Sequence, residues 1–352
     1  MVTWAGRAGA AERAVHTRHL HPVLALPGTR LGRVGWPGGV LGARWHYWWQ
    51  AHLLDCLLDA YVRAPTPWRR DAVAGLVRGV RLRNVTGWVN RYHDDIAWLG
   101  LALQRAATLA GVRRPDAERA IVHRLRIGRG PSGGMRWRVG DDFVNVPATG
   151  PAAILFARRG NPGLAASLAD WIIEQLIDPG TGLVFDGARV NPDGSVRTVE
   201  RNVYSYCQGV LLGACVELAA ATGQRRWADQ ADRTVHAVAG QLTDGGVLRG
   251  YGGGDGGLFT GILVRYLVLA VRSGPSAGLS AAPVARRLVL DSAEAAWRNR
   301  GVADGGPVFG PQWSVPASPP QPGRAERDLS VQLSGWMLLE AAAELERAQA
   351  PG

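Results

Sequence analysis

Two adjacent carboxylates, Asp94 and Asp95, follow Tyr92 and His93 and directly precede an amphipathic stretch over residues 96–103. A pair of carboxyl groups beside aromatic side chains can cleave a glycosidic bond, because one protonates the leaving oxygen while the other attacks the sugar or activates water. A structural role is also open, since Asp is a favoured helix N-cap and a second Asp in the first turn suits the helix dipole. The pair alone does not decide between these roles. We count Tyr92 and His93, which stand beside it, as candidate substrate-binding residues.

An aromatic block over residues 45–50 contains Trp45, Trp48 and Trp49 at the start of an expected helix. Tryptophan presents a large face on which the apolar face of a sugar can stack. At helical spacing the three rings cannot all lie on one side of the helix. We therefore expect one or two of them in the core and another at a cleft, with Trp48 and Trp49 as the candidates for substrate contact.

Polar side chains that could bind sugar hydroxyls occur in two further segments. Asp142 and Asn145 lie in a long loop, and Asn145 offers both a donor and an acceptor, although an Asx-turn would use the same residue. Tyr204, Tyr206 and Gln208 open an apolar helix. These three residues could contact hydroxyl groups, or they could form only a capping turn.

A glycine-rich loop over residues 252–257 leads into another expected helix and contains Asp255, with Phe259 shortly after it. The Lys and the Ser or Thr of a phosphate-binding P-loop are missing, as is a preceding strand, so phosphate binding has little support. Asp255 is an expected N-cap, and the loop could also form one wall of a cleft. We count Asp255 and Phe259 as candidate substrate-binding residues.

The histidines and cysteines give no sign of a metal site. The eight histidines show no HExxH spacing, and the three cysteines, Cys56, Cys207 and Cys215, show no CxxC spacing. An odd number of cysteines also argues against a disulfide framework. We expect no metal and no cofactor, and we expect buried thiols in a reducing compartment.

The 352-residue chain carries a formal net charge of +11, and all 40 of its basic residues are Arg. This usage fits GC-rich coding, and because the arginines are scattered among acids, no nucleic-acid partner is expected. No apolar run approaches the ~20 residues that span a bilayer, so no transmembrane segment is expected. The region 1–35 lacks a continuous apolar signal segment and a twin-Arg pair, which favours a cytoplasmic location unless export takes another route. A monomer is expected.

Helical periodicity dominates the sequence, and strand-like alternation is confined to short pieces such as 135–139 and 183–185. Short turns at 160–163 and 222–224 alternate with long loops that are rich in glycine and aromatic residues, a pattern typical of a closed ring of helical hairpins with its functional loops on one face. We predict an all-α protein with an arm over 1–35, possibly flexible, and a single domain over 36–348. Helices are expected near 41–63, 68–81, 95–110, 115–124, 149–159, 162–177, 204–222, 225–241, 256–273, 283–299 and 328–347.

In this order, these segments resemble glycoside hydrolase family 76, the endo-α-1,6-mannanases of bacteria and fungi, from about Trp45 to Leu339. The specific element is the double Asp within Tyr92–Trp98. The segments 142–150, 204–217 and 256–267 support it through their order. The resemblance implies an (α/α)6 toroid and a retaining mechanism on α-1,6-mannosidic linkages, with Asp94 as nucleophile and Asp95 as general acid/base.

The sequence departs from the family pattern at Val144, Thr149, Cys207 and Thr260, where the family has Lys or Asn. These departures put substrate contacts in doubt more than the acid pair. If the source is actinobacterial, the mannan backbone of a lipoglycan is the substrate that we hypothesise. An exo-mannosidase, a mannan transglycosylase and a non-catalytic glycan-binding protein remain alternatives on the same scaffold.

Overall fold

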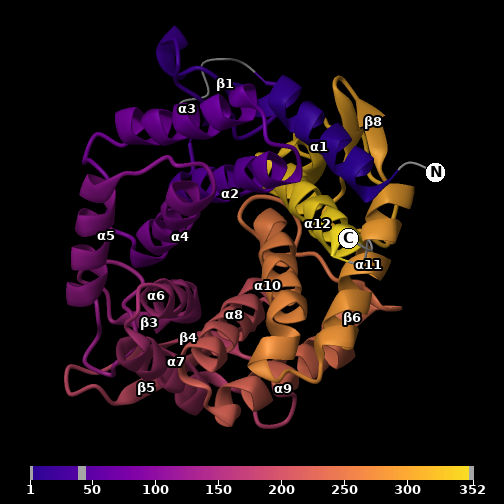
Figure 1. Cartoon of the computed structure of the whole chain (residues 1–352). Helices are drawn as coiled ribbons and strands as arrows, with labels where there is room; N and C mark the ends of the chain where they lie inside the picture. Colours follow the sequence, from indigo (N-terminus) through magenta and orange to yellow (C-terminus); the bar gives the residue numbers. More distant parts are fainter. Residues whose placement is uncertain (1–2, 39–44, 349–352) are drawn as a thin grey trace.

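The computed structural model describes residues 3–38 and 45–348, and within them the chain forms twelve α-helices arranged as two concentric rings (Figure 1). Even-numbered helices form the inner ring, in which each helix packs on the next and α12 packs on α2 to close the circle. Odd-numbered helices form the outer ring, each against an inner partner. The expected all-α toroid of helical hairpins is confirmed.

The inner helices are α2 (Tyr47–Arg63), α4 (His93–Leu109), α6 (Val146–Arg158), α8 (Ser205–Thr222), α10 (Gly256–Ala277) and α12 (Leu329–Arg347). The outer helices are α1 (Trp4–His19), α3 (Pro67–Arg83), α5 (Pro115–Ile127), α7 (Pro162–Leu176), α9 (Arg225–Gln241) and α11 (Ala282–Arg298). All eleven helices expected from periodicity occur. The first of them begins at Tyr47 rather than near 41, and residues 41–44 lie outside the described part of the chain.

The prediction of an N-terminal arm over 1–35 is wrong, because this segment contains the outer helix α1. Thr3 caps α1, whose small buried residues Ala8 and Ala11 allow close packing in the ring, where α1 lies against α12. Glu12 of α1 forms ion pairs with Arg63 and Arg69 of the next two helices. Periodicity did not reveal α1, since its packing face consists mainly of alanine and glycine rather than of large apolar residues.

Glycines let the inner helices approach closely. A Cβ atom on Gly209 of α8 would lie 2.9 Å from the Cα of Leu263 of α10, and one on Gly261 would lie 2.7 Å from the Cα of Ser334 of α12. Any side chain there would force the helices apart. The inner ring is therefore held at its present diameter by these contacts.

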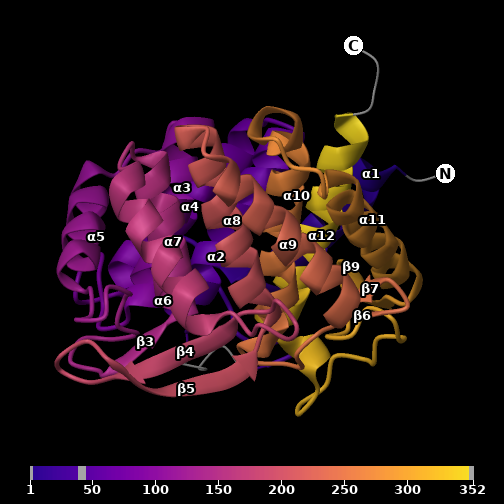
Figure 2. The same ribbon diagram turned by 90° about the horizontal axis from the view of Figure 1, so that it is seen from below.

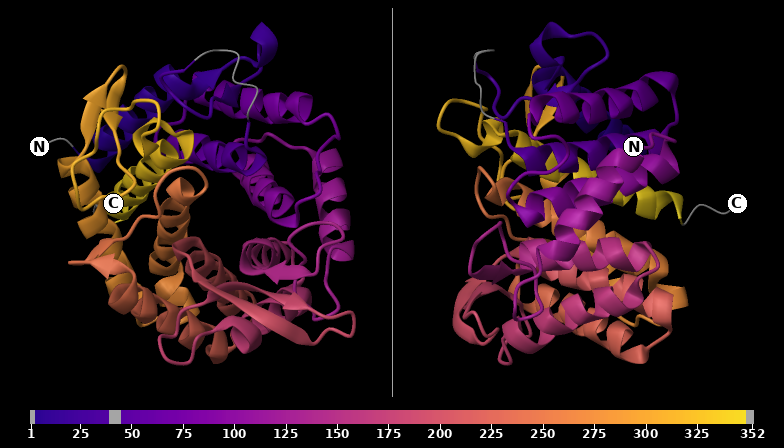
Figure 3. Two further views of the ribbon diagram at one scale, coloured as in Figure 1. Left: turned by 180° about the vertical axis from the view of Figure 1, so that it is seen from behind. Right: turned by 90° about the vertical axis from the view of Figure 1, so that its left-hand side faces the viewer.

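Short and long connections alternate, so the long loops collect at one face of the toroid (Figures 2 and 3). This face carries an antiparallel three-stranded sheet of β3 (Phe143–Asn145), β4 (Phe185–Val190) and β5 (Val196–Val203). Residues 135–139, where alternation had suggested a strand, form only isolated bridges. The remaining strands are two or three residues long: β1 (Leu20–His21), β2 (Leu31–Gly32), β6 (Thr243–Asp244), β7 (Val247–Leu248), β8 (Gly301–Ala303) and β9 (Gly306–Val308).

One stretch of α10, Gly256–Gly274, is long and apolar enough to cross a membrane by length and composition alone. No apolar run of that length was expected from the sequence. In the structure 67% of this stretch is buried inside the protein, as expected for an inner helix of a ring that is covered on most sides.

Candidate active site

A cleft of about 270 Å³ opens on the long-loop face, above the N-terminal ends of the inner helices. It gathers side chains from most of the ring, so the toroid rather than any single helix builds the site. The cleft is lined by Trp48, Asp94, Trp98, Trp137, Phe143, Asn145, Asp186, Tyr204, Tyr206, Asp255 and Phe259.

Asp94 stands in the first turn of α4 and is the member of the acid pair that lines this cleft. Its Oδ2 accepts a hydrogen bond of 3.1 Å from Nε1 of Trp137. Its Oδ1 is buried and has no hydrogen-bond partner among the described residues. A buried carboxylate oxygen normally has a partner, so this atom is available to a bound molecule.

Asp95 lies beside the cleft rather than in its lining, and its Oδ2 accepts a hydrogen bond of 2.6 Å from Nδ2 of Asn90. Neither carboxylate is the N-cap of α4, because that position is Tyr92, but both stand in the first turn, where an acid suits the helix dipole.

Both acids are harder to ionise than an ordinary aspartic acid. Burial raises the pKa of Asp94 to about 7, against the opposing effect of the Trp137 hydrogen bond, and nearby Asp255 adds to the rise. Burial and the negative charge of Asp94 raise the pKa of Asp95 well above its usual range, although Asn90 acts in the opposite direction. The hydrogen bonds to Asp94 therefore do not keep its pKa low, because the effect of burial outweighs them.

Aromatic rings form one wall of the cleft. Tyr206 stacks on Phe259 with ring centroids 4.0 Å apart and an interplanar angle of 8°, and Tyr204 and Tyr251 meet the same phenylalanine at a tilt. Trp48 lies 6.4 Å from Phe259. These contacts fix a broad apolar surface in the same cleft as Asp94, the kind of surface on which sugar rings stack.

Asp255 holds the tryptophan of this wall in place. Its Oδ1 accepts hydrogen bonds from Nε1 of Trp48 at 3.2 Å and from Nε1 of Trp49 at 2.8 Å. Trp48 reaches the cleft, whereas Trp49 is buried in the core and stacks on His46. The expected division of the tryptophan block between cleft and core is confirmed, but Trp49 itself is not a cleft residue.

Three other predicted substrate-binding residues have structural contacts instead. His93 is buried, and its Nδ1 lies 2.8 Å from the carbonyl oxygen of Arg136. Gln208 is buried and forms hydrogen bonds with both backbone groups of Val184, which tie α8 to the loop before β4. Asp142 forms ion pairs outside the cleft with two arginines of the β4–β5 hairpin.

Tyr92 and Asn145 make structural contacts and also lie at or beside the cleft. Tyr92 is half-buried and meets the Trp137 ring edge-on at 5.2 Å, so it supports the cleft without lining it. Asn145 does line the cleft, but its Oδ1 accepts from the backbone N–H of Ala148 and caps α6. The structural and the substrate-binding interpretations of Asn145 are compatible, since the side-chain Nδ2 is not used by the cap.

The structure adds four cleft residues that sequence reasoning did not select: Trp98, Trp137, Phe143 and Asp186. Trp98 and Phe143 stand inside the motifs that carried the family resemblance. The helical spacing of Trp98 and the strand alternation at Phe143 could therefore have indicated that both side chains reach the cleft. Asp186 gave no local signal, because strand pairing brings it to the site. Burial raises the pKa of Asp186 to about 6, and Cys207 contacts its Oδ1 at 3.8 Å.

The four departures from the family pattern are all buried, and none lines the cleft. Thr149 accepts a hydrogen bond from the backbone N–H of Met135 and donates one to the carbonyl of Asn145. Thr260 donates to the carbonyl of Arg249. These residues act on the cleft through the backbone that they support, not through direct contact with its contents.

Within the described residues, no group of three or more His, Cys, Asp or Glu side chains is placed to hold a metal ion. The three cysteines are buried and free. The cleft lining contains the carboxyl groups of Asp94, Asp186 and Asp255, which can donate or accept protons and attack as nucleophiles.

The sequence matches the family model for glycosyl hydrolase family 76 over residues 26–331. Among solved structures, it is similar to the GH76A α-1,6-mannanase of Salegentibacter sp. HEL1_6, with a TM-score of 0.85 and 31% identity over 97% of this chain and 99% of that one. An inactive variant of the same enzyme, with two consecutive aspartates changed to asparagine, matches equally in complex with α-1,6-mannotriose (TM-score 0.84, 30% identity, covering 97% of this chain and 99% of that one).

The Lin0763 protein of Listeria innocua matches with a TM-score of 0.84 and 25% identity over 99% of both chains. No curated protein has a significantly similar sequence. Since the family match spans most of the chain and the Salegentibacter enzyme is similar along its full length, the chain belongs to glycosyl hydrolase family 76 and is a glycoside hydrolase.

Proposed function

We propose that the protein cleaves α-1,6-mannosidic linkages of a mannan with retention of configuration at the anomeric carbon. The observation that carries this proposal is Asp94, which lines a cleft walled by stacked aromatic rings and whose buried Oδ1 has no hydrogen-bond partner among the described residues. The similar Salegentibacter enzyme, described as an α-1,6-mannanase, supports the choice of linkage.

In the first step, Asp94 attacks the anomeric carbon while Asp95 donates a proton to the leaving oxygen. A covalent mannosyl–enzyme forms, and Asp95 then removes a proton from the water that hydrolyses it. The electrostatics suit this sequence of events, because burial and the negative charge of Asp94 raise the pKa of Asp95, which can therefore hold the proton that a general acid donates.

The aromatic wall supplies binding energy without fixing the sugar through charge. Tyr206, Phe259 and Trp48 present apolar faces, whereas Asp186 and Asp255 offer carboxylate oxygens that accept from hydroxyl groups. A neutral polymer of hexose units meets both requirements. The long loops leave the cleft accessible from one face of the ring, which suits a chain substrate.

Asparagine substitutions test the acid pair directly. We expect Asp94→Asn and Asp95→Asn each to reduce kcat on linear α-1,6-mannan by three or more orders of magnitude, roughly the range for loss of a catalytic group. Binding of α-1,6-mannotriose, measured by calorimetry, should persist in both variants. Turnover that survives in either variant would contradict the assignment of that residue.

The matched control is Asp142→Asn, an exposed acid outside the cleft, which should leave turnover unchanged. Chromatography of products from wild type separates the possible outcomes: oligosaccharides of mixed length indicate endo-cleavage, single mannose units indicate exo-cleavage, and longer products formed with an acceptor indicate transglycosylation. An absence of any product while mannotriose still binds would favour a binding protein.

The natural substrate that we propose is the α-1,6-mannan backbone of an actinobacterial lipoglycan, and the Arg-only composition motivates this choice. Release of oligosaccharides from purified lipoglycan is the test. Because such a substrate lies outside the cytoplasmic membrane, fractionation of the producing cells with an antibody would decide between export and action on internal fragments.

A further inference from the structure

A second cavity, of about 490 Å³, lies in the wall of the toroid between α4, α5 and α6. It is separate from the catalytic cleft: its residue Gln104 stands ten residues after Asp94 in α4, about 15 Å further along the helix. The cavity falls in the size range of ligand pockets, about 300–1,000 Å³.

The floor of this cavity is apolar. Leu103 of α4, Ile121 of α5 and Leu155 of α6 are buried side chains that meet there, and Val122 extends the floor toward the opening. Gly100 lies beneath them, where a Cβ would already be 3.1 Å from both Ile121 and Leu155. Apolar side chains around an open space favour an apolar group that fills it.

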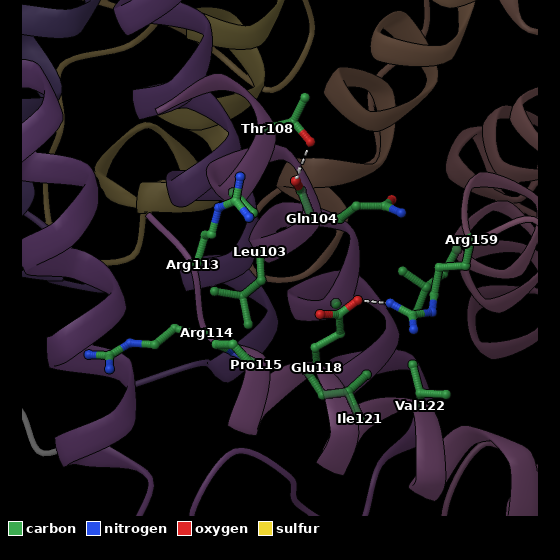
Figure 4. Close-up of a pocket in the computed structure, with 13 residues that line it drawn as sticks. Leu103, Gln104, Thr108, Arg113, Arg114, Pro115, Glu118, Ile121, Val122 and Arg159 are labelled. Atoms are coloured by element: carbon green, nitrogen blue, oxygen red, sulfur yellow. Dashed lines mark hydrogen bonds and ion pairs between the residues drawn. The ribbon is translucent and has the colours of Figure 1, made fainter. Parts of the chain in front are cut away.

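The rim of the cavity is positively charged, with three arginines against one glutamate. Arg159 is paired with Glu118, and Arg114 lies over the ring of Trp88. Arg113 has no ion-pair or hydrogen-bond partner among the described residues. Figure 4 shows Arg113 and Arg159 on opposite sides of the cavity, whereas Arg114 points away. Arg113 is therefore the cation that is available to a ligand.

Gln104 adds a second unsatisfied group. Its Oε1 is buried and has no hydrogen-bond partner within the described residues, although the residue borders the cavity. A half-turn of the carboxamide exchanges its oxygen and its N–H groups, so the side chain can serve as acceptor or donor. A buried polar group of this kind gains a partner when a polar ligand binds beside it.

We propose that this cavity binds an anionic amphiphile: a carboxylate or phosphate head group on a short alkyl chain or ring. The head group pairs with Arg113 and accepts a hydrogen bond from Gln104, while the apolar part covers Leu103, Ile121 and Leu155. A sugar fits less well, because no aromatic side chain lines this cavity, in contrast to the catalytic cleft.

Calorimetric titration with sodium octanoate tests the proposal on the full-length protein. We expect one octanoate to bind per chain, and octan-1-ol, which lacks the charge, to bind at least about fivefold more weakly. Arg113→Gln should weaken octanoate binding by about fivefold. The matched control is Arg119→Gln, which removes the same charge from α5 outside the cavity and should leave binding unchanged.

Ala107→Phe fills the cavity from α4 and should abolish octanoate binding while mannan hydrolysis continues. If this variant does not fold, Arg113→Gln and Arg119→Gln still decide the matter. Three results would overturn the proposal: no binding of octanoate by wild type at millimolar concentration, equal binding of octanoate and octanol, or equal effects of the two arginine substitutions.

Co-sedimentation with vesicles distinguishes a free ligand from a lipid. Binding to phosphatidylglycerol vesicles that is lost in Arg113→Gln assigns the head group to a lipid. Octanoate binding without co-sedimentation assigns the site to a soluble anion. A negative result with octanoate or with vesicles does not affect the proposed mannanase activity, because hydrolysis takes place in the catalytic cleft.

Discussion

Removing the hydrogen bond from Trp137 to Asp94 should shift the pH dependence of catalysis. Trp137→Phe keeps an aromatic ring at the edge of the cleft but deletes the Nε1 donor that lies 3.1 Å from Asp94 Oδ2. A hydrogen bond to a charged group contributes about 1.5–3 kcal/mol. Because Trp137 is only half-buried, we take the lower limit, which corresponds to about one pKa unit.

The sign follows from which form the donor stabilises. The N–H group favours ionised Asp94, so its loss raises the pKa of Asp94 from about 7 toward about 8. At pH 7 the ionised fraction of the nucleophile then falls from about one half to about one tenth. We expect the acidic limb of the kcat/KM profile on linear α-1,6-mannan to move to higher pH by about one unit.

The full pH profile separates this effect from a loss of stacking. A weaker sugar contact would raise KM at every pH without shifting the acidic limb of the kcat/KM profile. Phe143→Leu, which changes an aromatic cleft residue that donates no hydrogen bond to Asp94, is the control and should leave the limb in place. A limb that stays unchanged in Trp137→Phe, or moves to lower pH, would refute the reasoning.

Three further predictions concern stability and substrate contact. Asp94→Asn should raise the free energy of unfolding more at pH 8 than at pH 4.5. Burial raises the folded-state pKa of Asp94 to about 7, so the wild type loses stability as the pH rises from the unfolded-state pKa toward that value. Denaturant titration at both pH values measures the difference, and an equal effect at both would contradict the prediction. Asp255→Ala should raise KM more than it lowers kcat, since Trp48 loses its acceptor, and steady-state kinetics would contradict this if KM stayed constant. Glu12→Gln should lower the free energy of unfolding by about 3 kcal/mol, because it leaves Arg69 without a carboxylate partner and Arg63 with Glu340 alone, whereas exposed Arg13→Gln should change it little; equal effects in thermal unfolding would argue against the ion-pair account.

Periodicity predicted most of the architecture because the inner helices carry large apolar residues at regular spacing. It failed at α1, whose contacts depend on Ala8 and Ala11 and on the buried charge of Glu12, and none of these gives an apolar stripe. A helix that packs through alanine resembles a polar linker in the sequence. The alternation of short and long loops, by contrast, predicted the functional face without any knowledge of which helices or strands contact each other.

The candidate site was partly predictable for a similar reason. Asp94 and Tyr206 stand at helix N-termini, where the ring geometry brings the first turns of α2, α4, α8 and α10 to one cleft. Asp186 reaches the cleft only through the pairing of β4 with β3 and β5, which single-sequence alternation does not define. Gln208 and His93 were misassigned because a buried polar side chain that satisfies backbone groups looks the same in sequence as one that awaits a ligand.

The contact of α1 with α12 brings the first and the last of the described helices together: the backbone N–H of Trp4 lies 3.1 Å from Oε2 of Glu346. Because α12 is synthesised after the other described helices and closes the inner ring, the native contacts of α1 with it can form only after most of the ring has been made. The same proximity means that a short peptide could join the ends, with new termini opened at the tight turn around Gly223. Such a permuted chain would begin with a different helical hairpin and would show whether the order of assembly matters to the finished ring.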